Sequence, residues 1–258
     1  MESTAAATAA AAATNVAEPG TVDTARAAGT PLKGDAPAQP SYPVGATRIE
    51  VPIPDTYRYR AHPWHGLPVG DQAPNVVTAY IEIVPSDTVK FELDKVSGFL
   101  KVDRPQKYSN VTPSMYGFIP QTYCGKRIAQ HAGVERGDGD PLDVCVLSDR
   151  AISHGDFIVR VVPIGGLCLI DKGEADDKII AYVAQDEFFH GWRTLSDAPQ
   201  SIIERLQHYF LTYKMPPGWK TASELRFTYE RDEALKVINL AMEDYKEHMA
   251  ETAPKAKL

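Results

Sequence analysis

The densest group of carboxylates in this sequence is Asp138-Gly139-Asp140-Pro141-Leu142-Asp143, which runs directly into the apolar stretch Val144–Leu147. Carboxylates this close together repel one another unless a cation or a proton joins them. Gly139 and Pro141 favour a tight turn that lets the carboxylates converge. Hard oxygen ligands on a short loop are typical of Mg²⁺ sites, so the segment predicts one; the alternative is a solvated acidic turn. An EF-hand is excluded, because its spacing of Gly and Glu is missing.

A second acidic group consists of Asp171, Glu174, Asp176 and Asp177, followed at once by Lys178. It connects two predicted strands, which could bring it over the first group. Taken alone, it could equally be a surface loop. Two separate carboxylate clusters, each at a strand end, are suited to a phosphoryl-transfer site with more than one metal ion.

Further side chains in the sequence are able to bind phosphate. Lysine and arginine neutralise phosphate oxygens, arginine in a bidentate manner, and a tyrosine hydroxyl donates a hydrogen bond. The alternatives are a solvated strand face with weak ion pairs, and packed aromatic rings. The candidates are Lys90, Arg104, Lys178, Lys214, Tyr116 and Tyr213. Two carboxylates accompany them: Glu92 lies in the same expected strand as Lys90, and Glu82 lies in the strand before it.

The elements that must position these residues are short strands followed by two helices. Alternating or β-branched segments predict the strands, and apolar stripes at helical spacing predict the helices. This order indicates an α+β fold in which helices pack outside an antiparallel barrel or sheet. The expected strands are 78–84, 89–95, 142–147, 157–163 and 178–184, and the expected helices are 201–214 and 231–249.

The bulk properties are those of an ordinary globular chain. Of 258 residues, 43% are hydrophobic and 24% are charged, which predicts one domain with a substantial core. Residues 1–45 are rich in Ala, Thr and Pro and are expected to be a disordered tail, with a single domain over 46–258. The net charge of -7 argues against nucleic-acid binding. An acidic site can nevertheless take a phosphate substrate through recruited cations.

Compartment and membrane association are predicted from the cysteines and from hydropathy. Cys124, Cys145 and Cys168 are widely spaced, which favours reduced thiols over a disulfide framework. No apolar run is long enough to span a bilayer. Acidic residues near the N-terminus favour a cytoplasmic location over a mitochondrial one, which is the alternative.

Ordered sequence blocks between about Tyr80 and Lys214 resemble the family I soluble inorganic pyrophosphatases. The family signature Asp-x-Asp-Pro-aliphatic-Asp-aliphatic is present as DGDPLDV, from Asp138 to Val144. Flanking it in the same order are IEI around Glu82, KFELDK, VDR, YGFIP, the acidic loop 171–178, and TYK.

This resemblance implies a five-stranded, OB-like antiparallel β-barrel flanked by two C-terminal helices, and pyrophosphate as the substrate. It implies a homo-oligomer that binds neither nucleic acid nor membranes. A hydroxide shared by two Mg²⁺ ions would attack the phosphorus, and Asp140 would orient or deprotonate this nucleophile. Further roles follow from the family motif: Asp138, Asp143, Asp171, Asp176 and Glu92 would bind metal, Glu82 would support them, and Lys90, Arg104, Tyr116, Lys178, Tyr213 and Lys214 would bind phosphate.

Three features depart from the family pattern or lie outside it. Many members have a tyrosine at the position of Thr112. In this chain the role of that tyrosine is either dispensable or filled by Tyr108, Tyr116 or water. The stretch 124–137 is longer than in compact members. His62 and His65 in HPWHG could ligate a metal, but a packed or interface loop is the expectation.

Two other functions are compatible with parts of the sequence. A non-catalytic OB-type binding module would need a basic groove interleaved with aromatic residues, whereas the distinctive residues here are acidic. A metal-dependent phosphatase acting on organic phosphates would need base-stacking or sugar-binding elements, and none is evident.

Overall fold

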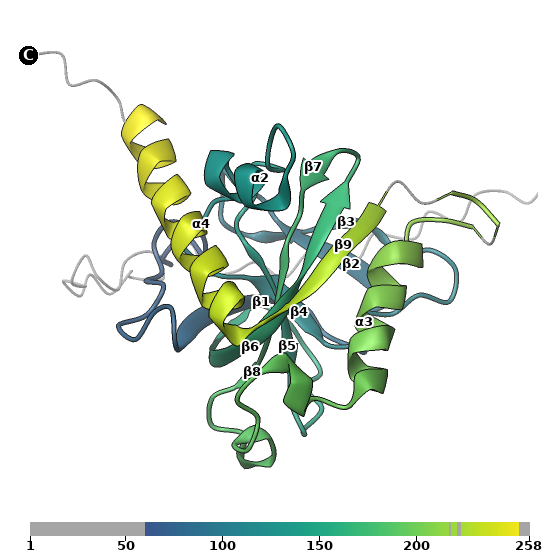
Figure 1. Ribbon diagram of the computed structural model, residues 1–258. Coiled ribbons are helices and arrows are strands. Elements are labelled where there is room, and N and C mark those ends of the chain that lie inside the picture. The colour runs from purple at the N-terminus through teal and green to yellow at the C-terminus, as the bar shows by residue number, and fades with distance from the viewer. Residues whose placement is uncertain (1–59, 217, 221–222, 253–258) are drawn as a thin grey trace, which may run out of the picture. The chain divides into compact units, whose positions relative to one another are not determined.

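Five β-strands pair in a ring that forms the centre of the fold (Figure 1). Four of the five pairings are antiparallel. The pairing between β5 (Asp143–Leu147) and β8 (Lys178–Val183) is parallel. The expected five-stranded OB-like arrangement is confirmed, but the expectation of an entirely antiparallel ring is wrong. An odd number of strands cannot close into a ring with every neighbour antiparallel. In ring order the strands are β1 (Val77–Ile83), β4 (Met115–Phe118), β5 (Asp143–Leu147), β8 (Lys178–Val183) and β6 (Phe157–Asp171).

The computed structural model describes residues 60–216, 218–220 and 223–252. All of them belong to one unit that spans Ile53–Leu258. The predicted tail over 1–45 lies outside the described residues, so that prediction stays open. Within the described residues, no helix is both long and apolar enough to cross a membrane.

After their charged first residues, strands β5 and β8 are continuously apolar, because both of their faces are buried. Successive side chains of a strand point to opposite faces, and in β5 they enter two different cores. Val144 and Val146 pack in one core, whereas Cys145 and Leu147 pack in the other. The same alternation continues in β8.

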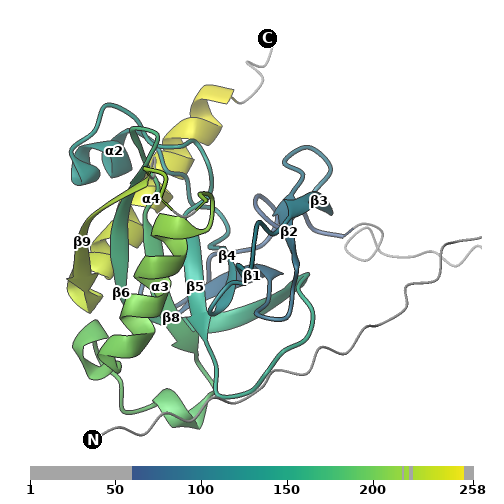
Figure 2. The ribbon, with the colours of Figure 1, turned by 90° about the vertical axis from the view of Figure 1, so that its right-hand side faces the viewer.

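Helices α3 (Gln200–Thr212) and α4 (Arg231–Thr252) each close one of these cores, on opposite sides of the strands (Figures 1 and 2). Leu206 and Phe210 of α3 pack with the core that contains Cys145. Val237 and Ile238 of α4 pack with the core that contains Val144. Both helices confirm the expectation from the sequence.

The remaining elements are short or extend predicted ones. Strand β6 is longer than expected, and its C-terminal half pairs with β9 (Ser223–Glu230). Gly166 permits this pairing, since a Cβ there would lie 2.4 Å from the ring of Tyr229. These elements are β2 (Val89–Leu93), β3 (Leu100–Pro105), β7 (Glu174–Ala175), β9 (Ser223–Glu230), α2 (Lys126–Ala132) and the 3₁₀ helices η1 (Glu187–Phe189) and η2 (Leu195–Asp197). The sequence reasoning predicted neither β9 nor the short elements β3, β4 and α2.

Candidate active site

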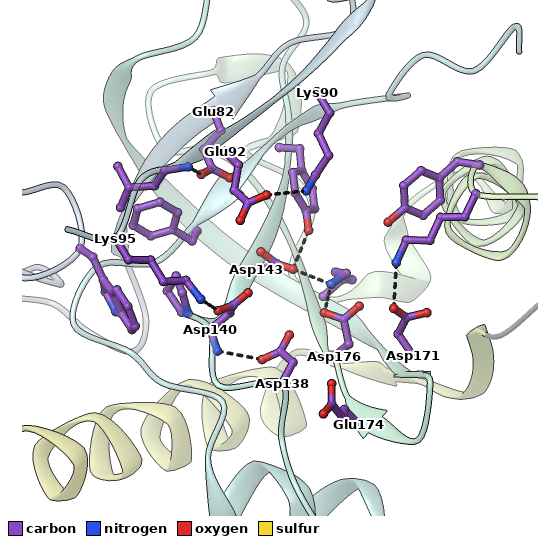
Figure 3. Close-up of a pocket in the computed structure, with 18 residues that line it drawn as sticks. Glu82, Lys90, Glu92, Lys95, Asp138, Asp140, Asp143, Asp171, Glu174 and Asp176 are labelled. Carbon is purple, nitrogen blue, oxygen red and sulfur yellow. Dashed lines mark hydrogen bonds and ion pairs between the residues drawn. The ribbon is translucent and has the colours of Figure 1, made fainter. Parts of the chain in front are cut away.

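A hollow of about 290 Å³ at the end of the strand ring gathers the candidate residues (Figure 3). Its walls come from β1, β2, β4, the starts of β5 and β8, the end of β6, and the residues that follow α3. Every residue to which the family resemblance assigned a role lines it except Arg104. The lining candidates are Glu82, Lys90, Glu92, Tyr116, Asp138, Asp140, Asp143, Asp171, Asp176, Lys178, Tyr213 and Lys214.

The parallel pairing of β5 and β8 joins the two acidic clusters. Asp143 begins β5 and Lys178 begins β8, and the two residues are partners in the ladder. Because parallel strands start at the same edge, the residues that precede each strand also meet there. This arrangement brings Asp176, two residues before Lys178, next to the first acidic cluster.

The loop that carries Asp138 is held by backbone contacts on both sides. The Asp138 amide donates to the carbonyl of Ala175 at 3.2 Å, beside the second acidic cluster. The Gly139 amide donates to the carbonyl of Cys124 at 3.2 Å, and Gly139 has a left-handed φ of 75°. The approach of the two segments requires glycine at position 137, because a Cβ there would lie 2.1 Å from the same carbonyl oxygen.

Lys178 is the centre of the buried charge in this hollow. Its side chain is only 3% exposed, and its Nζ contacts carboxylate oxygens of both Asp143 and Asp176. Burial alone would lower the pKa of Lys178, but these carboxylates outweigh burial and raise it well above its usual value. The lysine is therefore charged and balances part of the negative charge around it.

The carboxylates around Lys178 are short of positive charge. Burial, followed by repulsion from Asp176, raises the pKa of Asp138 to about 9. Burial also raises the pKa of Asp143, against the opposing effect of Lys178. Burial raises the pKa of Glu82 to about 8, although its carboxylate accepts a hydrogen bond from the Leu93 amide at 2.7 Å. The pKa values of these three acids are therefore raised, and an additional cation close to them would lower the values again.

Tyr116 contributes a proton donor next to the carboxylates. Its hydroxyl donates to Asp143 at 2.5 Å. Burial and the charge of Asp143 raise the pKa of Tyr116 well above its usual value, so the phenol stays protonated. Thr112 does not reach the hollow, since it is buried and its hydroxyl donates to the Ser114 carbonyl. Of the proposed substitutes for the missing tyrosine, Tyr116 lines the site and Tyr108 does not.

Two lining residues, Lys95 and Trp64, were missed by the sequence reasoning. Lys95 forms an ion pair with Asp140, and its Nζ lies 6.0 Å from the centre of the Trp64 ring. Glu174, which the second acidic group already included without a role of its own, also lines the hollow and pairs with Arg136 at 2.9 Å. Lys95 lies in a block quoted above, and its charge was the available signal. Trp64 had no signal of this kind, because only the tertiary structure brings the HPWHG segment to the hollow.

Two other groups of predicted residues lie elsewhere. The ring of His62 stacks on that of His65 at 4.7 Å, and His65 Nδ1 lies 3.0 Å from the hydroxyl of Tyr245, so the packed interpretation of HPWHG is confirmed. Asp177 belongs to the second acidic cluster but does not line the hollow; it lies between β7 and β8 in the sequence, is buried, and accepts a hydrogen bond from Tyr229 at 3.0 Å. The three cysteines are free and buried, as expected.

Arg104 lines a second hollow that adjoins the first. This hollow has a volume of about 440 Å³ and shares Lys90, Asp171, Tyr213 and Lys214 with the first one. Arg104 is the ladder partner of Lys90, and both contact the carboxylate of Asp103. Lys214 pairs with Asp171 at 2.8 Å.

Asp244 of α4 supports the Asp138 loop from behind, through the start of α2. Its buried carboxylate accepts hydrogen bonds from the amides of Gly125, Arg127 and Ile128 and from the Arg127 side chain. We expect Asp244→Ala to destabilise the fold by about 3–5 kcal/mol, because it leaves several backbone amides at the start of α2 without their acceptor and removes one of the ion pairs of Arg127. Thermal unfolding should show a midpoint lower by roughly 6–15 °C.

The matched control for this prediction is Glu243→Ala. Glu243 also lies on α4 and also pairs with Arg127, at 3.3 Å, but its side chain is 58% exposed. Such an exposed pair contributes about 1 kcal/mol or less. Equal midpoints for the two variants would show that the Asp244 network does not hold this region.

The residues present fit a cation with oxygen ligands. The donors are carboxylates. Burial and the neighbouring carboxylates raise the pKa values of Asp138 and Asp143, and a bound cation would lower them. Among the described residues, no three or more His, Cys, Asp or Glu side chains are arranged as a formed metal site. Lys178, between Asp143 and Asp176, and Lys95, on Asp140, hold oxygens that a metal ion would otherwise use.

Comparisons with known proteins agree on one family. The family model for inorganic pyrophosphatase matches residues 79–246. An inorganic pyrophosphatase of Chlamydia caviae is 47% identical over 195 residues, covering 71% of this chain and 90% of the relative. A soluble inorganic pyrophosphatase of Oryza sativa subsp. japonica is 34% identical over 223 residues, covering 86% of this chain and 97% of the relative. The crystal structure of inorganic pyrophosphatase from Thermus thermophilus superposes with a TM-score of 0.62 at 31% identity, covering 72% of this chain and 99% of that one.

Proposed function

Because this chain belongs to the inorganic pyrophosphatase family and thus hydrolyses pyrophosphate to two phosphates, we propose that Mg²⁺ is its cofactor and that the hollow around Lys178 is its active site. One observation carries the proposal. Half-buried carboxylates from two segments that are distant in the sequence, Asp143 and Asp176, converge on the single buried ammonium group of Lys178. Family membership favours this function over the binding module and the organic phosphatase.

The proposed metal ligands are divided between the two acidic clusters. Asp138, Asp143 and Asp176 would hold one Mg²⁺, and Asp143 would also hold a second. Asp171 and Asp176, with Glu92 near, would hold an ion that arrives with the substrate. Glu82 would support Glu92 and its neighbours through its bond to the Leu93 amide. Bound Mg²⁺ supplies two things: neutralisation of phosphate charge and a lower pKa for a coordinated water.

The proposed phosphate ligands lie where the two hollows meet. Lys90, Tyr213 and Lys214 line both hollows, and Arg104 lies beside them. The cationic groups of Lys90, Arg104 and Lys214 and the hydroxyl of Tyr213 would bind the phosphate oxygens. The cations would also stabilise the charge that develops on the leaving phosphate. Lys178 and Tyr116 face the carboxylates, and we assign them to the phosphate nearest those acids.

Asp140 is the proposed general base. Its carboxylate faces the hollow and has Lys95 as its partner in the described structure. It would accept the proton of the attacking water and orient that water towards phosphorus. The ion pair with Lys95 holds the carboxylate in place until substrate arrives.

Removal of divalent metal ions is expected to abolish phosphate release from pyrophosphate, and Mg²⁺ is expected to restore it. Ca²⁺ should bind the same oxygens but inhibit, because its larger radius and looser coordination activate water poorly. Phosphate release from pyrophosphate, ATP and a phosphomonoester should be measured with EDTA, Mg²⁺ and Ca²⁺. Undiminished release in EDTA, or equal rates with Ca²⁺ alone, would refute the cofactor assignment.

We also propose a homo-oligomer in the cytoplasm and one domain over residues 46–258. Exposed large apolar side chains, among them Ile158 at 56% and Phe188 at 66%, support self-association. Three free cysteines support a reducing compartment. Sedimentation and localisation of the full-length chain test these points.

A further inference from the structure

The second hollow extends the active site into a strongly basic region, here called the basic annex: Lys90, Arg104, Lys107, Lys172 and Lys214. Lys107 and Lys172 line the annex but not the hollow around Lys178. The annex volume of about 440 Å³ is large compared with the roughly 30 Å³ that one water occupies in the liquid. It can therefore hold an anion together with part of its hydration shell.

The cations of the annex differ in how well they are compensated. The single carboxylate of Asp103 forms ion pairs with both Lys90 and Arg104. Asp171 accepts from Lys214 at 2.8 Å and from the Ser223 hydroxyl at 2.7 Å. Within the described part of the chain, neither Lys107 nor Lys172 forms an ion pair with a carboxylate. These two lysines are the positive charges that remain available to a ligand.

Both lysines are held at the rim by ordered backbone. Lys172 and Gly173 form the two-residue turn between β6 and β7, and their left-handed φ values of 52° and 87° are those of a tight hairpin turn. Lys107 Nζ donates to the Lys214 carbonyl at 3.4 Å, and the Asn110 side chain donates to the Tyr213 carbonyl at 3.2 Å. These two hydrogen bonds, from Lys107 and Asn110, connect the loop that contains Lys107 to the residues that follow α3.

We propose that the basic annex binds one phosphate group in addition to the two of pyrophosphate, with Lys107 and Lys172 as its specific ligands. This inference rests on the proposed placement of pyrophosphate over the residues shared by the two hollows. The extra group is either free orthophosphate or the terminal phosphoryl of a linear triphosphate, since both present the same oxygens. Lysine acts here as a point charge, so binding weakens as salt rises.

The test compares wild type with Lys107→Met/Lys172→Met, which keeps side-chain length and removes two charges. The control Lys126→Met/Lys236→Met removes two exposed charges from α2 and α4, outside both hollows. Calorimetry on metal-free protein measures the Kd of orthophosphate and of tripolyphosphate, because the annex cations do not depend on metal. We expect the annex variant to raise the Kd about tenfold, with a few-fold from each exposed contact, and the control to change it less than twofold.

Each outcome decides the question. A raised Kd for tripolyphosphate alone identifies the end of a longer chain as the ligand, and a raised Kd for orthophosphate alone identifies the free product. The proposal fails if wild type binds neither anion without metal, or if the annex and control variants weaken binding equally. Hydrolysis of pyrophosphate at fixed free Mg²⁺, assayed on the same preparations, confirms folding. Its absence in wild type would overturn the proposed function, whereas the calorimetry judges the annex alone.

Discussion

Asp140→Asn is expected to lower the turnover of pyrophosphate on the order of 10²–10⁴-fold while leaving metal affinity nearly unchanged. The substitution keeps the size of the side chain but removes its capacity to accept a proton. It also releases Lys95, which pairs with Asp140 at the edge of the hollow and not with the deeper carboxylates. The pH optimum should move upward, because hydroxide must then form without help from this base.

Steady-state rates over a range of pH and free Mg²⁺ measure this effect. Asp71→Asn is the matched control, because Asp71 is 84% exposed, contacts only Arg160 in the described structure at 3.4 Å, and lies outside the hollow. Full recovery of Asp140→Asn activity by excess Mg²⁺ would make Asp140 a plain metal ligand and would contradict its assignment as the base.

Asp143→Asn is expected to reduce both metal affinity and turnover, each on the order of 10²-fold or more. Asp143 is the proposed ligand of two ions, and its carboxylate also accepts from Tyr116 and Lys178. The substitution therefore removes one charge from several interactions at once. Excess Mg²⁺ should restore only part of the activity, since one ligand position stays weak.

Metal titration followed by calorimetry, alongside turnover, separates the two losses. Glu174→Gln is the matched control within the same hollow, because Glu174 pairs with Arg136 and has no proposed catalytic role. It should change both quantities only slightly. If Asp143→Asn and Glu174→Gln lost affinity equally, the metal site would depend on the summed charge of the hollow and not on Asp143 as a ligand.

Local sequence was sufficient to predict the elements that alternate or run apolar over several residues. The segments around Val144 and Ile179 are buried on both faces, so their composition had to be continuously apolar, and they were recognised as strands. The helices α3 and α4 were recognised because each presents one apolar stripe to a core. Strand β9 was missed, because most of its side chains are exposed or half-buried and carry no clear periodicity.

The sequence likewise determined which residue types are available for chemistry, since the DGDPLDV signature and the ordered blocks around it depend only on local composition and spacing. What the tertiary structure alone decided is which of these residues meet. The parallel pairing of β5 with β8 places Asp143 opposite Lys178 and Asp176 beside Asp138, and it depends on how five strands close a ring. Trp64 reaches the site, and Asp177 does not line it, for the same kind of reason: contacts between distant segments are set by packing, which spacing along the chain does not encode.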